Sequence, residues 1–309
     1  MKVGEASLMR LTLAGGGGEP VDLVRTLASH GVASLPPFFP DGTNGTLTAT
    51  LAVDGGARTV EIRRAGRGAI SVAAAGGGLV DEAAIAAAVR HVLRLDADLS
   101  DFYGMATHDP QLSWVVSGAG RMMRCQTVFE DVIKTICTTN CTWSATERMV
   151  DALVGHLGRR APGSPAEGTA GRAFPGAEAM AEAGEDFYRD VARAGYRGAY
   201  LRSIAESVAS GGLDLDVLDA GHPAELPDDE VEARLLALPG VGPYAAAHIM
   251  MMLGRYSRLI LDSWTRPTYA RVVGRKRVAD RAIVRRFKPY GPYAGLAFWL
   301  FVTRDWVED

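Results

Sequence analysis

The chain has 309 residues, of which 48% are apolar and 22% charged. A chain of this length is too long to fold around one small hydrophobic core, which predicts two or three packed subdomains. No apolar run reaches the roughly 18 residues of a membrane span, and the N-terminal segment lacks the apolar core of a signal peptide, so we expect no membrane partner. The three cysteines form no paired framework, which indicates a reducing compartment such as the cytoplasm, and they are too few for the four thiolates of an iron–sulfur cluster.

The net charge of −3 disfavours a polyanionic partner, but the charges are unevenly distributed. From Arg255 onward the chain has twelve Lys and Arg residues against five Asp and Glu residues, an excess of +7, so the first 254 residues carry −10. A basic segment on an acidic body is typical of a surface that faces phosphates. The alternative is an ordinary solvated helix face.

The first 80 residues have the pattern of a small antiparallel β region. Short runs that partly alternate apolar and polar residues predict strands over residues 6–13, 46–53, 58–64 and 69–74. Asp54-Gly55-Gly56 predicts a hairpin turn between two of these strands. Residues 21–30 have the pattern of one amphipathic helix, a proline-rich loop is expected at 36–40, and the glycines at 76–78 end the region.

After residue 80 the pattern becomes helical. Apolar residues recur at helical spacing in segments 81–93, 128–136, 144–157, 179–193, 199–210, 228–236 and 244–253. Residues 159–173 are rich in Gly, Pro, Ala and Ser and predict an exposed loop. The sequence therefore predicts an α+β protein that is mostly helical and has a β-rich N-terminal part.

The most informative segment, Leu238-Pro239-Gly240-Val241-Gly242-Pro243, lies between the last two of these helices. Pro239 ends the first helix, and Pro243 suits the first turn of the next one. Gly240 and Gly242 permit a tight bend and the close approach of a partner. The free N–H groups at such a positive helix end suit one DNA phosphate. The alternative is an ordinary helix–helix turn, which often contains glycine.

A second motif, Leu261-Asp262, follows the hairpin, and Asp262 lies twenty positions after Gly242. With this combination the chain resembles the helix-hairpin-helix (HhH-GPD) DNA glycosylase superfamily, which includes endonuclease III, adenine glycosylase, 8-oxoguanine glycosylase and the bacterial 3-methyladenine glycosylase II. That family has an essential aspartate at this spacing. Residues 129–140 and 195–201 are similar to the family's helix before its DNA-probing loop and to the segment that packs before its hairpin.

The resemblance implies a mostly α-helical HhH-GPD core of two helical subdomains, with a small antiparallel β domain in front, as in the 3-methyladenine II and 8-oxoguanine branches. We expect the β domain with its helices over residues 1–95 and the glycosylase region over 96–309. Within the latter, the hairpin would span 228–254 and the catalytic segment 259–266. The implied function is base excision repair of double-stranded DNA by a monomer, cytoplasmic and associated with the nucleoid in a bacterium.

The resemblance also implies a role for single residues. Breaking a base–sugar bond builds positive charge on the sugar, which the carboxylate of Asp262 would stabilise while it orients water. A flipped base leaves a gap in the stack, and Asn140 is the expected residue to fill it, with a helix cap or turn as its alternative role. Gly240, Gly242, Tyr244 and Arg266 are expected at the DNA.

Aromatic residues near these motifs are expected to line the base pocket: Trp143, Tyr244 and Trp264, with Phe102 and Tyr103 as further candidates. Core packing is the alternative for each of them. His248 lies one helical turn after Tyr244 and would either reach the pocket or be a satisfied interior histidine. Relatives bind a monovalent cation through hairpin carbonyls, and the resemblance places a K⁺ or Na⁺ at Leu236, Leu238 and Val241.

The chain departs from the strand-nicking members of the family at Tyr244. Those members have a lysine nucleophile there, and a phenol cannot form a Schiff base. We therefore expect a monofunctional glycosylase without AP-lyase activity, with an alkylated purine as the leading substrate. No cysteine follows Cys141, so we expect no iron–sulfur cluster and no required cofactor.

Three alternatives stay open at this point. The excised base could be oxidised, deaminated or otherwise modified. The chain could be a non-catalytic HhH module that uses the hairpin only to hold phosphate, although Asp262 at the family spacing argues against it. A lyase could also use another lysine, such as Lys134.

Overall fold

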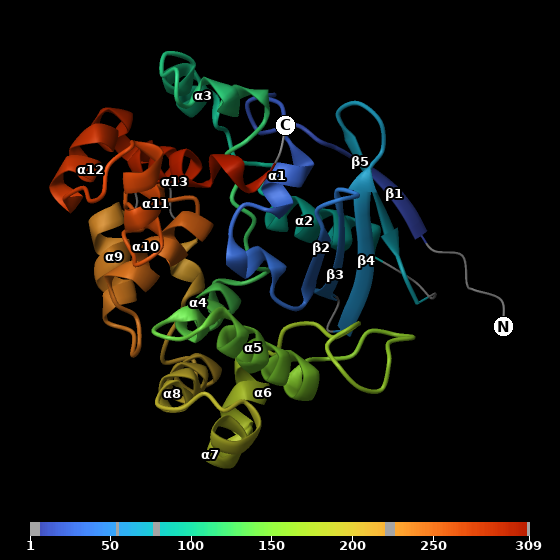
Figure 1. Cartoon of the computed structure of the whole chain (residues 1–309). Helices are drawn as coiled ribbons and strands as arrows, with labels where there is room; N and C mark the ends of the chain where they lie inside the picture. Colours follow the sequence, from blue (N-terminus) through green and yellow to red (C-terminus); the bar gives the residue numbers. More distant parts are fainter. Residues whose placement is uncertain (1–6, 54–55, 77–80, 220–225, 308–309) are drawn as a thin grey trace.

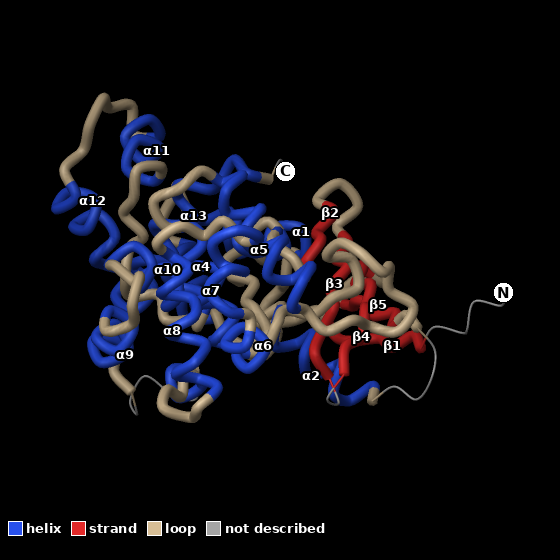
Figure 2. The backbone as a smooth tube through the Cα atoms, turned by 90° about the horizontal axis from the view of Figure 1, so that it is seen from below, coloured by secondary structure: helices blue, strands red, loops and turns tan. Residues whose placement is uncertain are grey.

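The computed structural model of the chain describes residues 7–53, 56–76, 81–219 and 226–307. One end of the molecule is a five-stranded antiparallel sheet, and the remainder is helical (Figures 1 and 2). This arrangement confirms the predicted fold class. Within the described ranges, every helix is too short or too polar to cross a membrane.

The sheet has the strand order β1-β5-β4-β3-β2. Its strands are β1 (Ser7–Thr12), β2 (Phe38–Asp41), β3 (Thr46–Val53), β4 (Gly56–Arg64) and β5 (Ala69–Ala74). Alternation along β3 places Leu47, Ala49 and Leu51 in the core, which is why this strand was predictable from its pattern. Asp54 and Gly55 of the predicted turn lie outside the described residues.

The helices match the predicted segments over most of the chain. They are α1 (Leu23–Leu27), α2 (Glu82–Val92), α3 (Ser100–Thr107), α4 (Val128–Thr138), α5 (Trp143–Leu157), α6 (Ala177–Glu182), α7 (Gly184–Asp186), α8 (Arg197–Ala209), α9 (Asp228–Leu236), α10 (Pro243–Met252), α11 (Thr265–Val272), α12 (Asp280–Phe287) and α13 (Ala294–Thr303). Shorter turns are η1 (Gly31–Ser34), η2 (Ser113–Ser117), the π-turn η3 (Phe187–Val191), η4 (Asp216–Leu218), η5 (Lys288–Tyr293) and η6 (Arg304–Trp306).

Three predictions were wrong. The helix over residues 21–30 is only α1, because Asp22 caps its start and His30 is already extended. The proline-rich loop at 36–40 runs into strand β2, which tolerates Pro40 because it lies at the sheet edge. The helix over 179–193 is broken into α6, α7 and η3, and Gly184 has a φ of 66° at the break.

The buried apolar residues form two large clusters that meet at α10. The first joins the sheet to α2, α4, α5 and α8–α10, and the second joins α3 to α11–α13. On α10, Ala246 and Ile249 belong to the first cluster and Ala247 and Met251 to the second. All residues from 245 to 252 are buried, so the three consecutive methionines are packing residues. Because the first cluster continues across residue 95, the domain boundary there stays a prediction.

Buried charges connect the sheet to the helices. Lys134 on α4 is fully buried, its Nζ lies 2.7 Å from Oε1 of Glu130, and it donates to the carbonyl oxygen of Leu35 at 3.3 Å. The ammonium also lies 4.7 Å from the ring centre of Phe38 on β2. A buried cation without such partners would strongly destabilise the fold, so α4 and β2 are held at a fixed spacing.

A second buried pair joins segments that are far apart in the sequence. The guanidinium of Arg121 is fully buried and pairs with Glu19, and it also donates to the carbonyl oxygen of Ala97 at 2.9 Å. Glu19 accepts in addition from the backbone N–H of Leu99 at 2.8 Å. These bonds hold the chain between β1 and α1 against the segment that enters α3.

Arg121→Ala should lower the free energy of unfolding by about 3–5 kcal/mol, because it leaves the carboxylate of Glu19 buried without its partner. Urea unfolding followed by circular dichroism measures the change. Arg189→Ala removes an exposed arginine paired with Asp190 and serves as the control, with an expected change near zero. An equal loss in both variants would contradict the role given to the buried pair.

Candidate active site

The hairpin joins α9 to α10 and is anchored by its apolar residues. Leu238 and Val241 are buried, and Gly240 has a φ of 84°. A Cβ at Gly240 would lie 2.6 Å from Cδ2 of Tyr200, so this position requires glycine. At Gly242, by contrast, nothing lies within 4 Å of a built Cβ, which leaves open space in front of the α10 N-terminus.

No side chain caps α10, which starts at Pro243. In the part of the chain that the structure describes, the N–H groups of Tyr244 and Ala245 make no backbone hydrogen bond. The helix end therefore offers free donors to an anion, as the sequence predicted.

Asp262 lies just before α11 and is half-buried. Its Oδ1 accepts from the N–H of Trp264 at 2.8 Å and from that of Thr265 at 2.6 Å. The hydroxyl of Thr265 accepts in return from the Asp262 N–H at 2.9 Å and donates to the carbonyl oxygen of Ile260 at 2.7 Å. This reciprocal cap fixes the carboxylate, while Oδ2 makes no hydrogen bond with any described residue.

Tyr244, at the start of α10, lies within the electrostatic reach of Asp262. Burial raises the pKa of its phenol, and the charge of Asp262 adds to the rise, so the hydroxyl stays protonated. That hydroxyl lies 3.3 Å from Oγ1 of Thr138, the last residue of α4. The hairpin helix, α4 and the α11 cap therefore meet at one place.

Aromatic side chains from α10 and the C-terminal segment form a continuous cluster beside Asp262. The aromatic cluster consists of Tyr244, His248, Trp264, Trp299 and Trp306. Tyr244 stacks on His248 at 6.0 Å between ring centres and 18° between ring planes, and Trp264 lies 5.3 Å from Trp306. Trp264 and Trp306 are 39% and 43% exposed, whereas Trp299 is 6% exposed, so the cluster leads from the surface inward.

Two buried histidines close the inner end of the cluster. Burial lowers the pKa of His248 to about 3 and that of His30 to about 4, so both rings are neutral at pH 7. Their centres are 5.4 Å apart, and Nδ1 of each lacks a hydrogen-bond partner among the described residues. Nε2 of His30 donates to the carbonyl oxygen of Met123 at 2.6 Å. His248 is therefore an interior histidine, but its Nδ1 is not satisfied by any described residue.

The turn between α4 and α5 lies next to the hairpin, with α8 in contact with both. Asn140 is exposed at the turn with a φ of 47°, and its Nδ2 donates to the hydroxyl of Tyr196 at 3.4 Å. The ring of Tyr196 lies 5.8 Å from that of Tyr200, which packs on Gly240. Figure 1 shows the same arrangement of α4, α8 and the α9–α10 connection.

Other predicted site residues have different surroundings. Trp143 is 42% exposed at the start of α5 and packs on Gly31, and no ring contact joins it to the aromatic cluster within the described residues. Phe102 and Tyr103 are core residues of the second apolar cluster, so core packing was the correct reading for both. Arg266 is exposed on α11 and donates two hydrogen bonds of 2.9 Å to Asp280.

The predicted cation site consists of backbone carbonyls in the hairpin. Those of Leu236 and Val241 accept no hydrogen bond from the described residues, whereas that of Leu238 accepts from the Val241 N–H at 3.2 Å. Free carbonyl oxygens are suitable ligands for K⁺ or Na⁺, so these residues fit such an ion. The ion itself stays a prediction.

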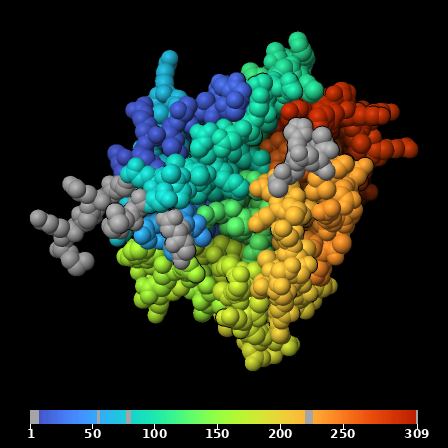
Figure 3. Space-filling view, turned by 180° about the vertical axis from the view of Figure 1, so that it is seen from behind, coloured from blue at the N-terminus to red at the C-terminus, as the bar shows by residue number. Residues whose placement is uncertain are grey.

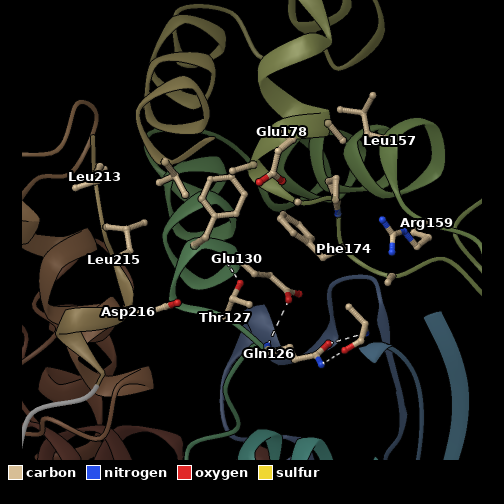
Figure 4. A pocket seen from close by; sticks show the side chains of 18 of the residues that line it. Gln126, Thr127, Glu130, Leu157, Arg159, Phe174, Glu178, Leu213, Leu215 and Asp216 are labelled. Carbon is tan, nitrogen blue, oxygen red and sulfur yellow. Dashed lines mark hydrogen bonds between the residues drawn. The ribbon is translucent and has the colours of Figure 1, made fainter. Parts of the chain in front are cut away.

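A cleft of about 870 Å³ lies elsewhere, between the sheet and helices α4, α5, α6 and α8 (Figure 4). Carboxylates of Glu130, Glu178 and Asp216 line it, and its wall contains no residue of α10, α11 or α13. Negative walls repel a phosphate backbone, so this cleft is not the candidate active site.

Sequence reasoning missed His30, Trp299 and Trp306. These residues come from a loop and from two C-terminal elements that were not predicted, and they converge only in the folded chain. The available signal was the occurrence of two tryptophans within the last eleven residues of the sequence.

No protein-family model and no curated protein sequence matches the chain. Solved structures match over nearly its whole length. A 3-methyladenine DNA-glycosylase from Archaeoglobus fulgidus has a TM-score of 0.72 at 19% identity, covering 96% of this chain and 98% of the other. An 8-oxoguanine glycosylase/lyase from Clostridium acetobutylicum has a TM-score of 0.71 at 19% identity, covering 98% and 99%. The same enzyme bound to double-stranded DNA has a TM-score of 0.71 at 20% identity, covering 99% of each chain. The chain therefore has the fold of these DNA glycosylases, including the N-terminal sheet.

Proposed function

We propose that the chain is a monomeric DNA N-glycosylase that flips a damaged base out of double-stranded DNA and hydrolyses its bond to the sugar. The observation that carries the proposal is the geometry of Asp262. One carboxylate oxygen is fixed by two backbone N–H groups, and the other is free beside Tyr244 at the head of the hairpin helix. The shared fold with two DNA glycosylases supports the proposal.

The chemistry follows from this geometry. As the base leaves with the bonding electron pair, positive charge develops on the deoxyribose, and a fixed negative oxygen stabilises it. Water then attacks the sugar carbon, and the carboxylate orients it or takes its proton. The free N–H groups at the start of α10 would hold a neighbouring phosphate, and Asn140 would fill the space of the extruded base.

The proposed enzyme is monofunctional. The described residues include three lysines, and none is placed as a nucleophile beside Asp262. Lys134 is buried against Glu130, which argues against it as the alternative nucleophile, while Lys276 and Lys288 are exposed around α12. Tyr244 stands at the hairpin position and keeps its proton. A Schiff base with an abasic sugar needs a neutral amine, which this site does not offer.

An alkylated purine is the substrate that suits the aromatic cluster best. Many alkylated purines carry a positive charge, and electron-rich rings attract cations at their faces. Tyr244, Trp264 and Trp299 supply such faces, and the neutral rings of His30 and His248 add no repelling charge. A neutral oxidised base would gain only the stacking energy from these aromatic rings and no attraction between charge and ring.

Asp262→Asn should lower the rate of base excision at least a hundredfold, because the amide keeps the acceptor for the cap but loses the negative charge. The assay incubates duplexes with single lesions, among them a methylated purine, 8-oxoguanine and uracil, and reveals abasic sites with alkali. The melting temperature of the variant serves as the control for folding. Tight duplex binding without an abasic product for any lesion would favour a non-catalytic binding module.

Borohydride should trap no covalent complex between the wild-type chain and a duplex that contains an abasic site, because none of the lysines in the described part of the chain lies beside Asp262 to form a Schiff base. Gel electrophoresis of the reduced mixture is the measurement. Tyr244→Lys, which places an amine at the head of α10, is the matched comparison. A trapped wild-type complex would overturn the monofunctional assignment.

The stability of the chain should fall as the pH is lowered from 7 to 5. Unfolded histidine binds a proton below about pH 6.5, whereas His248 stays neutral in the fold until about pH 3, so acid favours the unfolded chain. Between pH 7 and pH 5 the free energy of unfolding of His248→Gln should therefore fall by about 2 kcal/mol less than that of the wild type. Urea unfolding at both pH values measures this difference. The exposed control variant His108→Gln should follow the wild type, and identical behaviour of His248→Gln would contradict the buried, neutral ring.

A further inference from the structure

The C-terminal helices carry a set of cations that the proposed chemistry does not use. The basic ridge consists of Arg275, Lys276, Arg277, Arg281, Arg285 and Lys288. All six side chains are exposed, and none makes an ion pair or side-chain hydrogen bond with a described residue. In the space-filling view, side chains of this part of the chain project from the edge of the molecule (Figure 3).

Neighbouring arginines have a different role. Arg255 pairs with Asp228, Arg258 with Asp229 and Glu232, and Arg286 with Asp109, so these cations hold the helices together. The only acidic residue between positions 271 and 288 is Asp280, and Arg266 occupies both of its oxygens. The ridge is therefore a positive surface that the fold does not neutralise.

The basic residues and the buried residues of α12 lie on different faces of the helix. Ile283 and Phe287 are buried in the second apolar cluster. Arg281, Arg285 and Lys288 follow at spacings of four and three residues, which places them on one exposed face. The loop with Arg275, Lys276 and Arg277 extends this face towards α11.

The ridge is connected directly to the candidate active site. Helix α11 starts at Thr265, whose N–H is capped by Asp262, and its eight residues rise about 12 Å before the ridge begins. The pair between Arg266 and Asp280 ties the start of α12 to the start of α11. One short helix therefore links the ridge to Asp262, and the pair between Arg266 and Asp280 joins the two ends of this segment.

We propose that the basic ridge binds the phosphates of duplex DNA that flank the nucleotide held at the hairpin. The inference rests on the proposed function. Duplex DNA has one negative charge per roughly 1.7 Å of its axis, so the ridge spans several phosphates. It would supply affinity that is independent of sequence and sensitive to salt, while the hairpin and Asp262 supply position and chemistry.

The test compares two triple variants with the wild type on an undamaged 30-base-pair duplex. Arg275→Ala/Lys276→Ala/Arg277→Ala removes three ridge cations. Arg63→Ala/Arg64→Ala/Arg67→Ala removes three exposed cations around the β4–β5 turn, on the opposite side of the molecule, and changes the net charge equally (Figure 1). Fluorescence anisotropy of the labelled duplex, titrated with protein, gives the binding constant at salt concentrations between about 50 and 300 mM.

For the ridge variant, the slope of log K against log salt should become shallower by about three relative to the wild type, since each phosphate contact contributes about 0.9. Its affinity at low salt should fall at least about tenfold, while the β4–β5 variant keeps the wild-type slope. Equal slopes in all three proteins, or equal losses in both variants, would overturn the proposal. The duplex is undamaged, so the outcome does not depend on excision: a wild-type chain that excises no lesion would refute the glycosylase function and leave the ridge measurement intact.

Discussion

The burial of α10 between two apolar clusters is the constraint on which the site depends. A helix packed on all sides cannot rotate without opening both cores, so its first turn has a fixed direction. That turn carries the free N–H groups of the hairpin and the ring of Tyr244. The first core positions it against α4 and α8, and the second against α11 and α13. The candidate site therefore lies where the two apolar clusters meet, and Tyr244 packs against both of them.

The capping of α11 places a charged group beside this turn at little energetic cost. An aspartate before a helix is stabilised by the N–H groups it accepts from, and the cap uses one oxygen only. The other oxygen is held in place without being neutralised. A free carboxylate on a flexible loop would have to be ordered at each turnover, whereas Asp262 is ordered by the fold itself.

Local features of the site were predictable from the sequence, and features assembled from distant segments were not. The hairpin, Asp262 and its helix depend on residues that follow one another in the chain, so their spacing was informative. Strand β3 alternates over part of its length, whereas α13 is almost entirely apolar and has no helical periodicity to detect. Trp299 on α13 and His30 near the sheet both contact the ring of His248 although 269 positions separate them, a convergence that no local pattern encodes. Trp143, which was expected to line the base pocket, packs on Gly31 instead.

Three of the five tryptophans of the chain, Trp264, Trp299 and Trp306, meet in the aromatic cluster. The intrinsic emission of the protein is therefore weighted towards this one place. A base that stacks on these rings would quench or shift that emission before any bond breaks. The arrival of the extruded nucleotide and its cleavage would then be two separately timed optical events, observable without a label on protein or DNA.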